Sequence, residues 1–465
     1  MKKSKIRSIA VLVIVLFGVI AMLIGCLAQE DIALSKEIEI ERLIRERVDN
    51  GYSVSIVVGV LDKDSSKYYN YGKLAKGSTQ DVNENTIYEI GSITKVFTSL
   101  ILADMVEEGE ISLDDPIDKF LPKEVKVPTR NGKKITLQHL ATHTSGLPRM
   151  PENFAPEDWS NPYADYTVED TYDFLSNYTL NRDIGAQYEY SNFGAGLLGH
   201  TLALKSGITY EQVVVNRICN ELGLKNTTIS LTPQQQVLLA KGHFGDTEVA
   251  NWDWQALAGA GALRSTASDM LTFLSAEMGL KETKLYQAME KTQIVFAPIG
   301  IPGYEVGLGW HIMKKFNSEI ICHSGETGGY KSFMGFDKKN KKAVVVLSNS
   351  KGDISDIGFY ILNQNFELKT LKKAVAVDPS IYDDFIGEYE FAPNVALTIS
   401  REGDKLFARV TGQDKFEILP LSETRYFYKG EIVDAEISFI RDETGKVNEL
   451  IWHEQEGDET AKRIK

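Results

Sequence analysis

Ser92 and Lys95 are the residues whose types and spacing point most directly to chemistry. At three positions apart on a helix, two side chains share one face, with Cβ atoms about 5–6 Å apart. A serine hydroxyl becomes nucleophilic when a neighbouring base removes its proton, and a lysine buried among apolar groups can have a pKa low enough to do so. A helix that begins at Ser92 would also favour a developing oxyanion at its N-terminus. The pair predicts acyl transfer, although a serine N-cap followed by a solvated lysine has the same spacing.

Two further motifs carry polar groups that suit this chemistry. Tyr190 and Asn192 precede a helical run and would supply a phenolic proton relay and an amide for a substrate carbonyl. The second motif, residues 322–329 (CHSGETGG), ends an apolar strand, where an edge of small residues can pair with an extended substrate. Taken alone, each motif is equally an ordinary helix start or a glycine-rich turn.

Taken together, the three motifs resemble those of the penicillin-recognising serine hydrolases, in the branch of class C beta-lactamases and D-alanyl-D-alanine carboxypeptidases. Ser-x-x-Lys, Tyr-x-Asn and Lys/His-x-Gly stand here at 92–95, 190–192 and 323–325. The stretches 140–148 (LATHTSGLP) and 259–270 (GAGALRSTASDM) also look like that branch. The resemblance covers roughly residues 35–370.

The resemblance implies three catalytic residues and no metal or organic cofactor. Ser92 would be the acylated nucleophile, Lys95 its general base, and Tyr190 a proton shuttle. The cycle would form an acyl-enzyme and then hydrolyse it with water.

The resemblance also implies the substrate-binding groups. Asn192 would bind the substrate amide, and the backbone N–H of Glu326 would join that of the nucleophile in the oxyanion hole. Within the triplet His323-Ser324-Gly325, the histidine would face the substrate carboxylate, where many beta-lactamases have lysine. Because a histidine is half charged near pH ~6.5, affinity for carboxylated substrates is expected to weaken from roughly pH 6 to 8.

The segments that must position these residues predict an α/β fold. β-branched strand patterns occur at 53–61 and 67–71, and return at 305–314, 319–323, 331–336 and 342–347. Between them lie a buried helix at 92–108 and a mainly helical region to about residue 300, and a helix at 354–368 follows. We therefore expect an α/β sheet layer plus a helical subdomain over residues 35–370, and the family resemblance implies that the sheet is antiparallel and flanked by helices.

Short alternating strands follow, at 395–400, 405–411, 425–428, 435–441 and 449–452. They predict a small all-β, barrel-like domain over residues 380–465. It resembles the lipocalin-like extension of some peptidases of this branch, and compact beta-lactamases lack such a domain.

The N-terminus predicts export. Residues 1–7 (MKKSKIR) are basic, residues 9–24 carry no charge, and Gly25-Cys26 resembles a lipobox. Residues 1–26 are therefore expected to be a signal segment lipidated at Cys26, and an uncleaved N-terminal anchor is the alternative. Both place the rest of the chain outside the cytoplasm, tethered to a membrane.

The composition of the chain argues against two classes of binding partner, nucleic acids and metal ions. A net charge of −14 without a Lys/Arg-rich run argues against nucleic-acid binding. The seven histidines and the cysteines have no zinc-type spacing, so no metal site is expected. Cys219 and Cys322 are expected to be two separate buried thiols, although sequence does not exclude their pairing.

The sequence thus predicts a membrane-tethered serine hydrolase that acts on D-amino-acid peptides or beta-lactams. An esterase of the same fold and a penicillin-binding sensor or scaffold without turnover are the alternatives.

Overall fold

The computed structural model describes residues 38–431, 433–454 and 457–465, so Cys26 and the expected signal segment lie outside the described residues. Residues 38–49 form a helix. In these described ranges, no helix combines the length and the apolar character needed to cross a bilayer.

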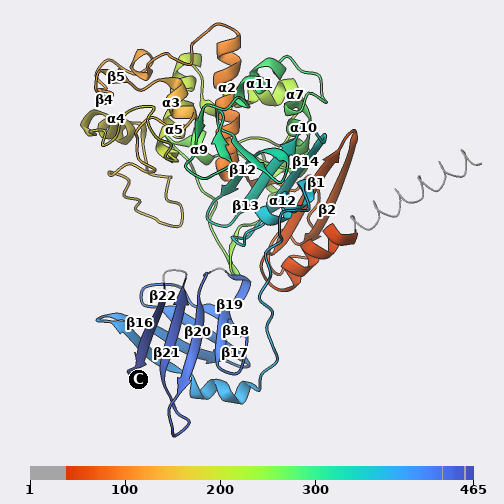
Figure 1. Cartoon of the computed structure of the whole chain (residues 1–465), viewed down its shortest axis with the longest axis vertical. Coiled ribbons are helices and arrows are strands. Elements are labelled where there is room, and N and C mark those ends of the chain that lie inside the picture. Colours follow the sequence, from red (N-terminus) through yellow and green to blue (C-terminus); the bar gives the residue numbers. More distant parts are fainter. Residues whose placement is uncertain (1–37, 432, 455–456) are drawn as a thin grey trace, which may run out of the picture. The chain divides into compact units, whose positions relative to one another are not determined.

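An antiparallel sheet forms the frame of the region that precedes the barrel in the chain (Figure 1). Its order within the described chain is β2-β1-β14-β13-β12-β11-β10-β9. The strands are β1 (Ser55–Asp62), β2 (Ser65–Gly72), β9 (Ala297–Pro298), β10 (Tyr304–Val306), β11 (His311–Lys315), β12 (Ser318–Glu326), β13 (Lys331–Asp337) and β14 (Lys342–Ser348). β1 pairs with β14, with Ile56 opposite Ser348, so parts of the chain that are distant in sequence lie side by side in one sheet.

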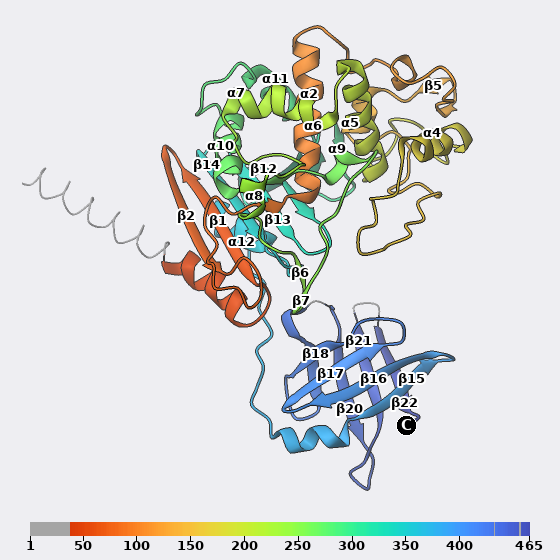
Figure 2. The ribbon, with the colours of Figure 1, turned by 180° about the vertical axis from the view of Figure 1, so that it is seen from behind.

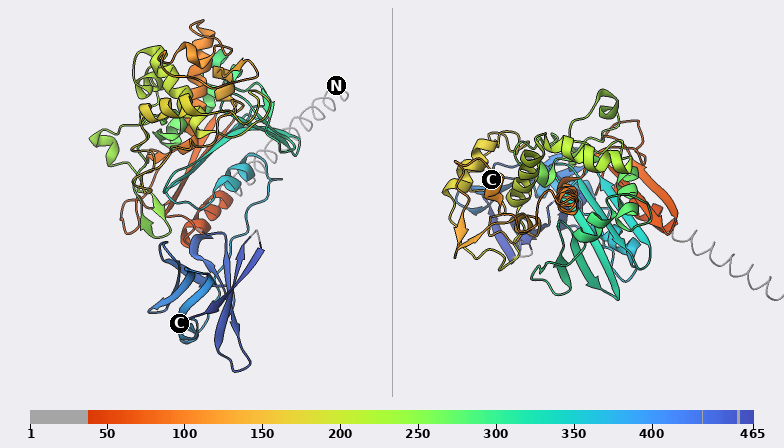
Figure 3. Two further views of the ribbon diagram at one scale, coloured as in Figure 1. Left: turned by 90° about the vertical axis from the view of Figure 1, so that its left-hand side faces the viewer. Right: turned by 90° about the horizontal axis from the view of Figure 1, so that it is seen from above.

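Helices cover both faces of this sheet. Helix α12 (Ser355–Leu362) packs on β13 and β14, and α10 (Ala267–Glu277) packs on β1 and β14 from the other side, as the edge-on view in Figure 3 shows. Because both faces are covered, β1 is buried along nearly its whole length. Helix α2 (Thr94–Glu107) is buried almost all round, in contact with α5 (Asn192–Ser206) and α9 (Ala258–Gly261) (Figure 2).

Shorter elements complete this region. They are β3 (Tyr88–Glu89), η1 (Gly91–Ile93), η2 (Ile117–Lys119), β4 (Thr129–Arg130), β5 (Lys133–Lys134), α3 (Leu137–Ala141), α4 (Val168–Asn177), α6 (Tyr210–Val214), η3 (Val215–Cys219), α7 (Asn220–Leu222), α8 (Pro233–Gln236), β6 (His243–Phe244), β7 (Thr247–Glu248), β8 (Arg264–Ser265) and α11 (Tyr286–Thr292).

A closed antiparallel barrel follows the sheet region along the chain (Figure 1). Its elements are η4 (Pro379–Asp384), β15 (Gly387–Ala392), β16 (Val395–Glu402), β17 (Lys405–Val410), β18 (Phe416–Pro420), β19 (Arg425–Tyr428), η5 (Lys429–Glu431), β20 (Glu436–Arg441), β21 (Val447–Glu454) and β22 (Gly457–Arg463). Every second residue points inward, and aromatic side chains such as Tyr389, Tyr426 and Phe439 fill the core.

The expected fold class is confirmed, with differences in detail. The strand expected at 305–314 is divided between β10 and β11, because Gly309 turns the chain at φ +72° against Ser99 of α2. The helix expected at 354–368 ends at Leu362, where Asn363 becomes extended and its amide binds Ser318 Oγ at 3.0 Å. Three barrel strands, β15, β18 and β22, were not expected.

Two glycines bring β12 against the start of α2. Gly91 has φ +49°, and a Cβ there would lie 2.7 Å from the backbone nitrogen of Glu326. A Cβ on Gly325 would overlap the carbonyl oxygen of Ile90. Both positions therefore require glycine, and the end of β12 lies directly beside Ser92.

We predict that Gly91→Ala lowers the free energy of unfolding by about 2 kcal/mol or more, because it adds a backbone clash to the left-handed strain. Gly109→Ala is the matched control, since Gly109 also has positive φ (+72°) but faces open space. It should cost only about 1 kcal/mol. Urea unfolding of both variants measures the difference, and equal losses would contradict the close approach of β12.

Candidate active site

The side chains of Ser92 and Lys95 meet at the start of α2. Lys95 Nζ lies 2.9 Å from Ser92 Oγ and donates a second hydrogen bond, of 2.7 Å, to the carbonyl oxygen of Ala260 in α9. One turn further along α2, Thr98 Oγ1 donates to the carbonyl oxygen of Gly259 at 2.7 Å. The backbone of α9 therefore fixes the lysine amine beside the serine hydroxyl.

Burial shifts Lys95 toward its neutral form. Its side chain is only 2% exposed. Removal from water lowers the pKa of Lys95 well below its ordinary value, and the nearby positive charge of Arg149 lowers it further. The neutral amine has a lone pair that can accept the proton of Ser92, as the sequence prediction requires.

The aromatic ring of Tyr190 lies close to the Lys95 amine. Lys95 Nζ is 4.9 Å from the centroid of the Tyr190 ring, and Arg149 Cζ is 5.2 Å from it. Removal from water raises the pKa of Tyr190 to about 12, although its hydrogen bond with Ser92 and the Arg149 charge oppose the rise. Tyr190 therefore keeps its proton near neutral pH, which suits a relay that donates a proton to a leaving group.

The loop over residues 143–149 positions the Tyr-x-Asn motif. His143 Nδ1 accepts a hydrogen bond from the backbone N–H of Ser191 at 3.1 Å, and its carbonyl oxygen accepts from Glu189 N–H at 2.8 Å. The carbonyl oxygen of Arg149 accepts from Asn192 N–H at 3.0 Å. The stretch 140–148, noted in the sequence only as a likeness, thus aligns the motif by backbone hydrogen bonds.

Asn192 begins α5 and presents an amide to the site. Ser191 is the N-cap of this helix, and its Oγ accepts from Gly194 N–H at 2.8 Å. Asn192 is 8% exposed, and its buried Oδ1 has no hydrogen-bond partner among the described residues. A buried acceptor left without a partner is costly, so this oxygen suits a substrate N–H.

The end of β12 offers an open edge beside Ser92. β11 begins at His311, opposite Cys322, so within the described sheet residues 323–326 have a paired strand on only one side, β13. The unpaired backbone groups can bind an extended chain. Since Glu326 lies against Gly91, its N–H and that of Ser92 are neighbours, as an oxyanion hole requires.

Two stacked histidines line the same edge. The rings of His323 and His311 have centroids 4.9 Å apart, and His323 Nδ1 lies 2.6 Å from the carbonyl oxygen of Ser324. Removal from water lowers the pKa of His311 to about 4 and that of His323 well below its ordinary value. The charge expected on His323 is therefore missing at neutral pH.

Three residues at this site were not expected from the sequence. They are Arg149, His311 and Tyr188, whose hydroxyl lies 3.0 Å from His311 Nε2. Arg149 directly follows the 140–148 stretch and was detectable as a cation beside it. His311 comes from a strand adjacent only in space, and no local signal marks it.

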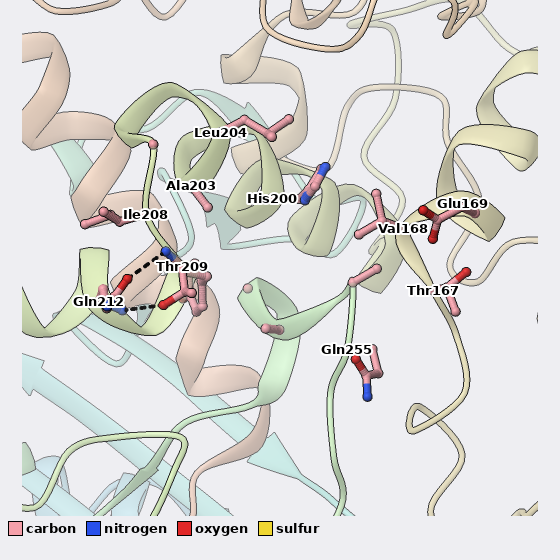
Figure 4. A pocket seen from close by; sticks show the side chains of 15 residues that line it. Thr167, Val168, Glu169, His200, Ala203, Leu204, Ile208, Thr209, Gln212 and Gln255 are labelled. Carbon is pink, nitrogen blue, oxygen red and sulfur yellow. Dashed lines mark hydrogen bonds between the residues drawn. The ribbon is translucent and has the colours of Figure 1, made fainter.

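A separate cavity of about 900 Å³ lies along the second half of α5 (Figure 4). His200, Leu204 and Gln255 line it, and none of the predicted catalytic or substrate-binding residues does.

Cys219 and Cys322 are buried free thiols. The described residues contain no cluster of three or more His, Cys, Asp or Glu that suits a metal ion.

Residues 40–359 match the family described as Beta-lactamase. The chain belongs to the beta-lactamase family. Residues 371–463, which contain the barrel, match a second family, described as a domain of unknown function, DUF3471. These matches confirm the resemblance to the penicillin-recognising serine hydrolases that the three motifs indicated.

Individual relatives agree with this membership. The D-alanyl-D-alanine-carboxypeptidase/endopeptidase AmpH of Escherichia coli K12 is 31% identical over 305 residues, which cover 63% of this chain and 78% of AmpH. Penicillin-binding protein 4* of Bacillus subtilis is 25% identical over 430 residues, covering 86% and 92%. A solved beta-lactamase/D-alanine carboxypeptidase from Yersinia pestis has a TM-score of 0.60 at 26% identity, covering 67% and 92%. The chain is a serine acyl hydrolase.

We predict that the acylation rate rises with pH through the lowered pKa of Lys95 and reaches its plateau well below pH ~10.4, the ordinary lysine value. The neutral amine is the active base, so a lowered pKa moves the whole rise to lower pH. Lys95→Ala should slow acylation by ~10²-fold or more and abolish this profile. Stopped-flow acylation measures both. A wild-type rate that still climbs beyond pH ~10 would contradict the assignment.

Proposed function

We propose that this chain is an extracytoplasmic hydrolase that forms an acyl-enzyme on Ser92 and cleaves peptides ending in a D-amino acid. The observation that carries the proposal is the 2.9 Å contact between Ser92 Oγ and the buried Lys95 amine. The names of the relatives, which include a D-alanyl-D-alanine carboxypeptidase and a penicillin-binding protein, support the substrate class.

In the proposed acylation, Ser92 Oγ attacks the carbonyl carbon of the peptide bond and neutral Lys95 takes its proton. The backbone N–H groups of Ser92 and Glu326 bind the oxyanion. As the C–N bond breaks, Tyr190 donates a proton to the leaving amine and regains one from Lys95. Water then attacks the ester, its proton passes back to Ser92 Oγ, and the acid product leaves.

The substrate would lie along the open edge of β12. Its backbone would pair with residues 324–326, and Asn192 would bind its amide. Arg149 is exposed beside Tyr190, and a guanidinium suits a carboxylate by its planar donor geometry, whereas burial lowers the pKa of His323 and favours its neutral form. We assign recognition of the terminal carboxylate to Arg149, and to His323 a neutral contact with the substrate.

The proposed location rests on the first residues of the chain. A basic start, an uncharged stretch over residues 9–24 and Gly25-Cys26 together favour export and lipidation of Cys26. Metabolic labelling with a palmitate analogue should mark the wild-type chain but not Cys26→Ala. Equal labelling of both would remove Cys26 as the lipidation site.

The substrate class is tested by turnover of four probes. We expect release of D-alanine from diacetyl-L-Lys-D-Ala-D-Ala, no release of alanine from the L-Ala-L-Ala isomer, and no activity in Ser92→Ala. A chromogenic cephalosporin and a nitrophenyl ester distinguish the remaining activities. Turnover of the ester alone would identify an esterase, and a lasting cephalosporin adduct without turnover of any probe would identify a sensor.

We predict that Arg149→Gln raises KM for the free-carboxylate peptide by ~10-fold or more, because it removes a charge-assisted hydrogen bond. The C-terminally amidated peptide should be cleaved equally by both proteins, and Arg149→Lys should keep part of the affinity. KM of the wild-type enzyme should also stay flat between roughly pH 6.5 and 8, since neutral His323 does not titrate there. A KM that rises with pH over this range would return the carboxylate to His323.

A further inference from the structure

The closed barrel formed by β15 to β22 contains a cavity of about 290 Å³ at one end. Its volume is at the lower limit of small-molecule sites, so it suits a small ligand rather than a long acyl chain. The proposed catalytic cycle does not use this cavity.

The pattern along β21 and β22 places two carboxylates at the mouth of the barrel, in the inward-facing register but with their side chains exposed to solvent. Inward-facing residues alternate along β21, and the series Leu450, Trp452, Glu454 runs from the packed core to the cavity. Glu459 of β22 stands directly opposite Trp452 in the ladder and shares its face. The inward-facing series thus ends at the barrel mouth in two exposed acidic residues that border the cavity.

Aromatic rings form the cavity wall. Trp452 contacts Phe391 edge to face, with centroids 6.0 Å apart, and contacts Tyr428 at 5.7 Å. Tyr428 in turn contacts Phe416 at 6.5 Å. Trp452 is 9% exposed, and its indole N–H donates to Glu454 Oε1 at 2.6 Å, which orients this carboxylate. The rings and the Glu454 carboxylate therefore belong to one hydrogen-bonded and packed unit.

The charge of the cavity has one sign. Asp414, Glu454 and Glu459 line it, and no lysine or arginine of the described residues does. None of the three carboxylates forms an ion pair within that part of the chain. Nor do they make up a cluster of metal-binding type among the described residues. Aromatic faces together with uncompensated carboxylates attract an organic cation, and alkyl groups on its nitrogen reduce the desolvation cost.

We propose that this end of the barrel is a binding site for a small aliphatic ammonium ion, with the nitrogen near Glu454 and Glu459 and the alkyl groups against Trp452 and Tyr428. The candidate ligands share one chemical feature, a compact positive charge with apolar carbon atoms next to it. A trimethylammonium headgroup and the primary amine of a lysine-type side chain both present it.

The test is a calorimetric titration of the full chain with choline, in parallel with its neutral isostere 3,3-dimethylbutan-1-ol. Choline should bind ~10-fold more tightly or better, because the two probes differ only in the charge that the rings and carboxylates recognise. Nα-acetyl-lysine amide forms the third arm. Tighter binding of choline assigns the site to alkylated ammonium, and tighter binding of the lysine derivative assigns it to primary amines.

Glu459→Gln and Glu454→Gln should each weaken binding of the preferred cation by several-fold and leave the weak binding of the neutral isostere unchanged. Glu443→Gln, in an exposed turn of the same barrel, is the matched control and should bind as the wild type does. Ser92-dependent hydrolysis by each variant confirms that the chain is folded. Equal affinity for choline and its isostere, or full affinity in Glu454→Gln/Glu459→Gln, would overturn the proposal whether or not the proposed hydrolase activity is found.

Discussion

The site depends on one physical constraint, the removal of the Lys95 amine from water. Burying a charged ammonium without a carboxylate partner has a desolvation free-energy cost of roughly several kcal/mol, so burial favours the neutral amine. Among the described residues, the polar contacts that the structure gives this amine are Ser92 Oγ and the carbonyl oxygen of Ala260. Neither group compensates a full positive charge, and the Arg149 guanidinium nearby adds to the cost. The result is a base that is held against the hydroxyl it must deprotonate.

The surrounding fold satisfies this constraint from three directions. Helix α2 is buried almost all round, and the half-buried Ser92 lies in η1, directly before the first turn of α2. The end of β12 lies against Gly91 and brings Glu326 N–H beside the nucleophile. The 143–149 loop fixes the Tyr-x-Asn motif through backbone hydrogen bonds, so that the Tyr190 ring covers the lysine amine. Residues far apart in sequence thus meet around one buried nitrogen.

Much of this arrangement was predictable because local signals mark it. Gly91 permits the turn before Ser92, the apolar residues of α2 surround the helix, and β-branched runs mark β1 and β14. One of the strands that were missed, β22, lacks such a signal. β22 (GDETAKR) has one buried residue, Ala461, and its extended state comes from pairing with β21 and β15.

The charge state of the site was not predictable either. From sequence, His323 was expected to carry a charge for the substrate carboxylate. Its stacking on His311 and its burial, which lower its pKa, arise only when β11 and β12 pair. Arg149 was overlooked because its proximity to Tyr190 depends on the path of a loop rather than on a spacing rule.

The most direct test of this account is the intact mass of the protein after mixing with a chromogenic cephalosporin, followed by peptide mapping of any adduct. The account predicts an added acyl group located on Ser92, formed by the wild-type chain and formed ~10²-fold more slowly by Lys95→Ala. An adduct located on another residue, or one that Lys95→Ala forms at the wild-type rate, would contradict it.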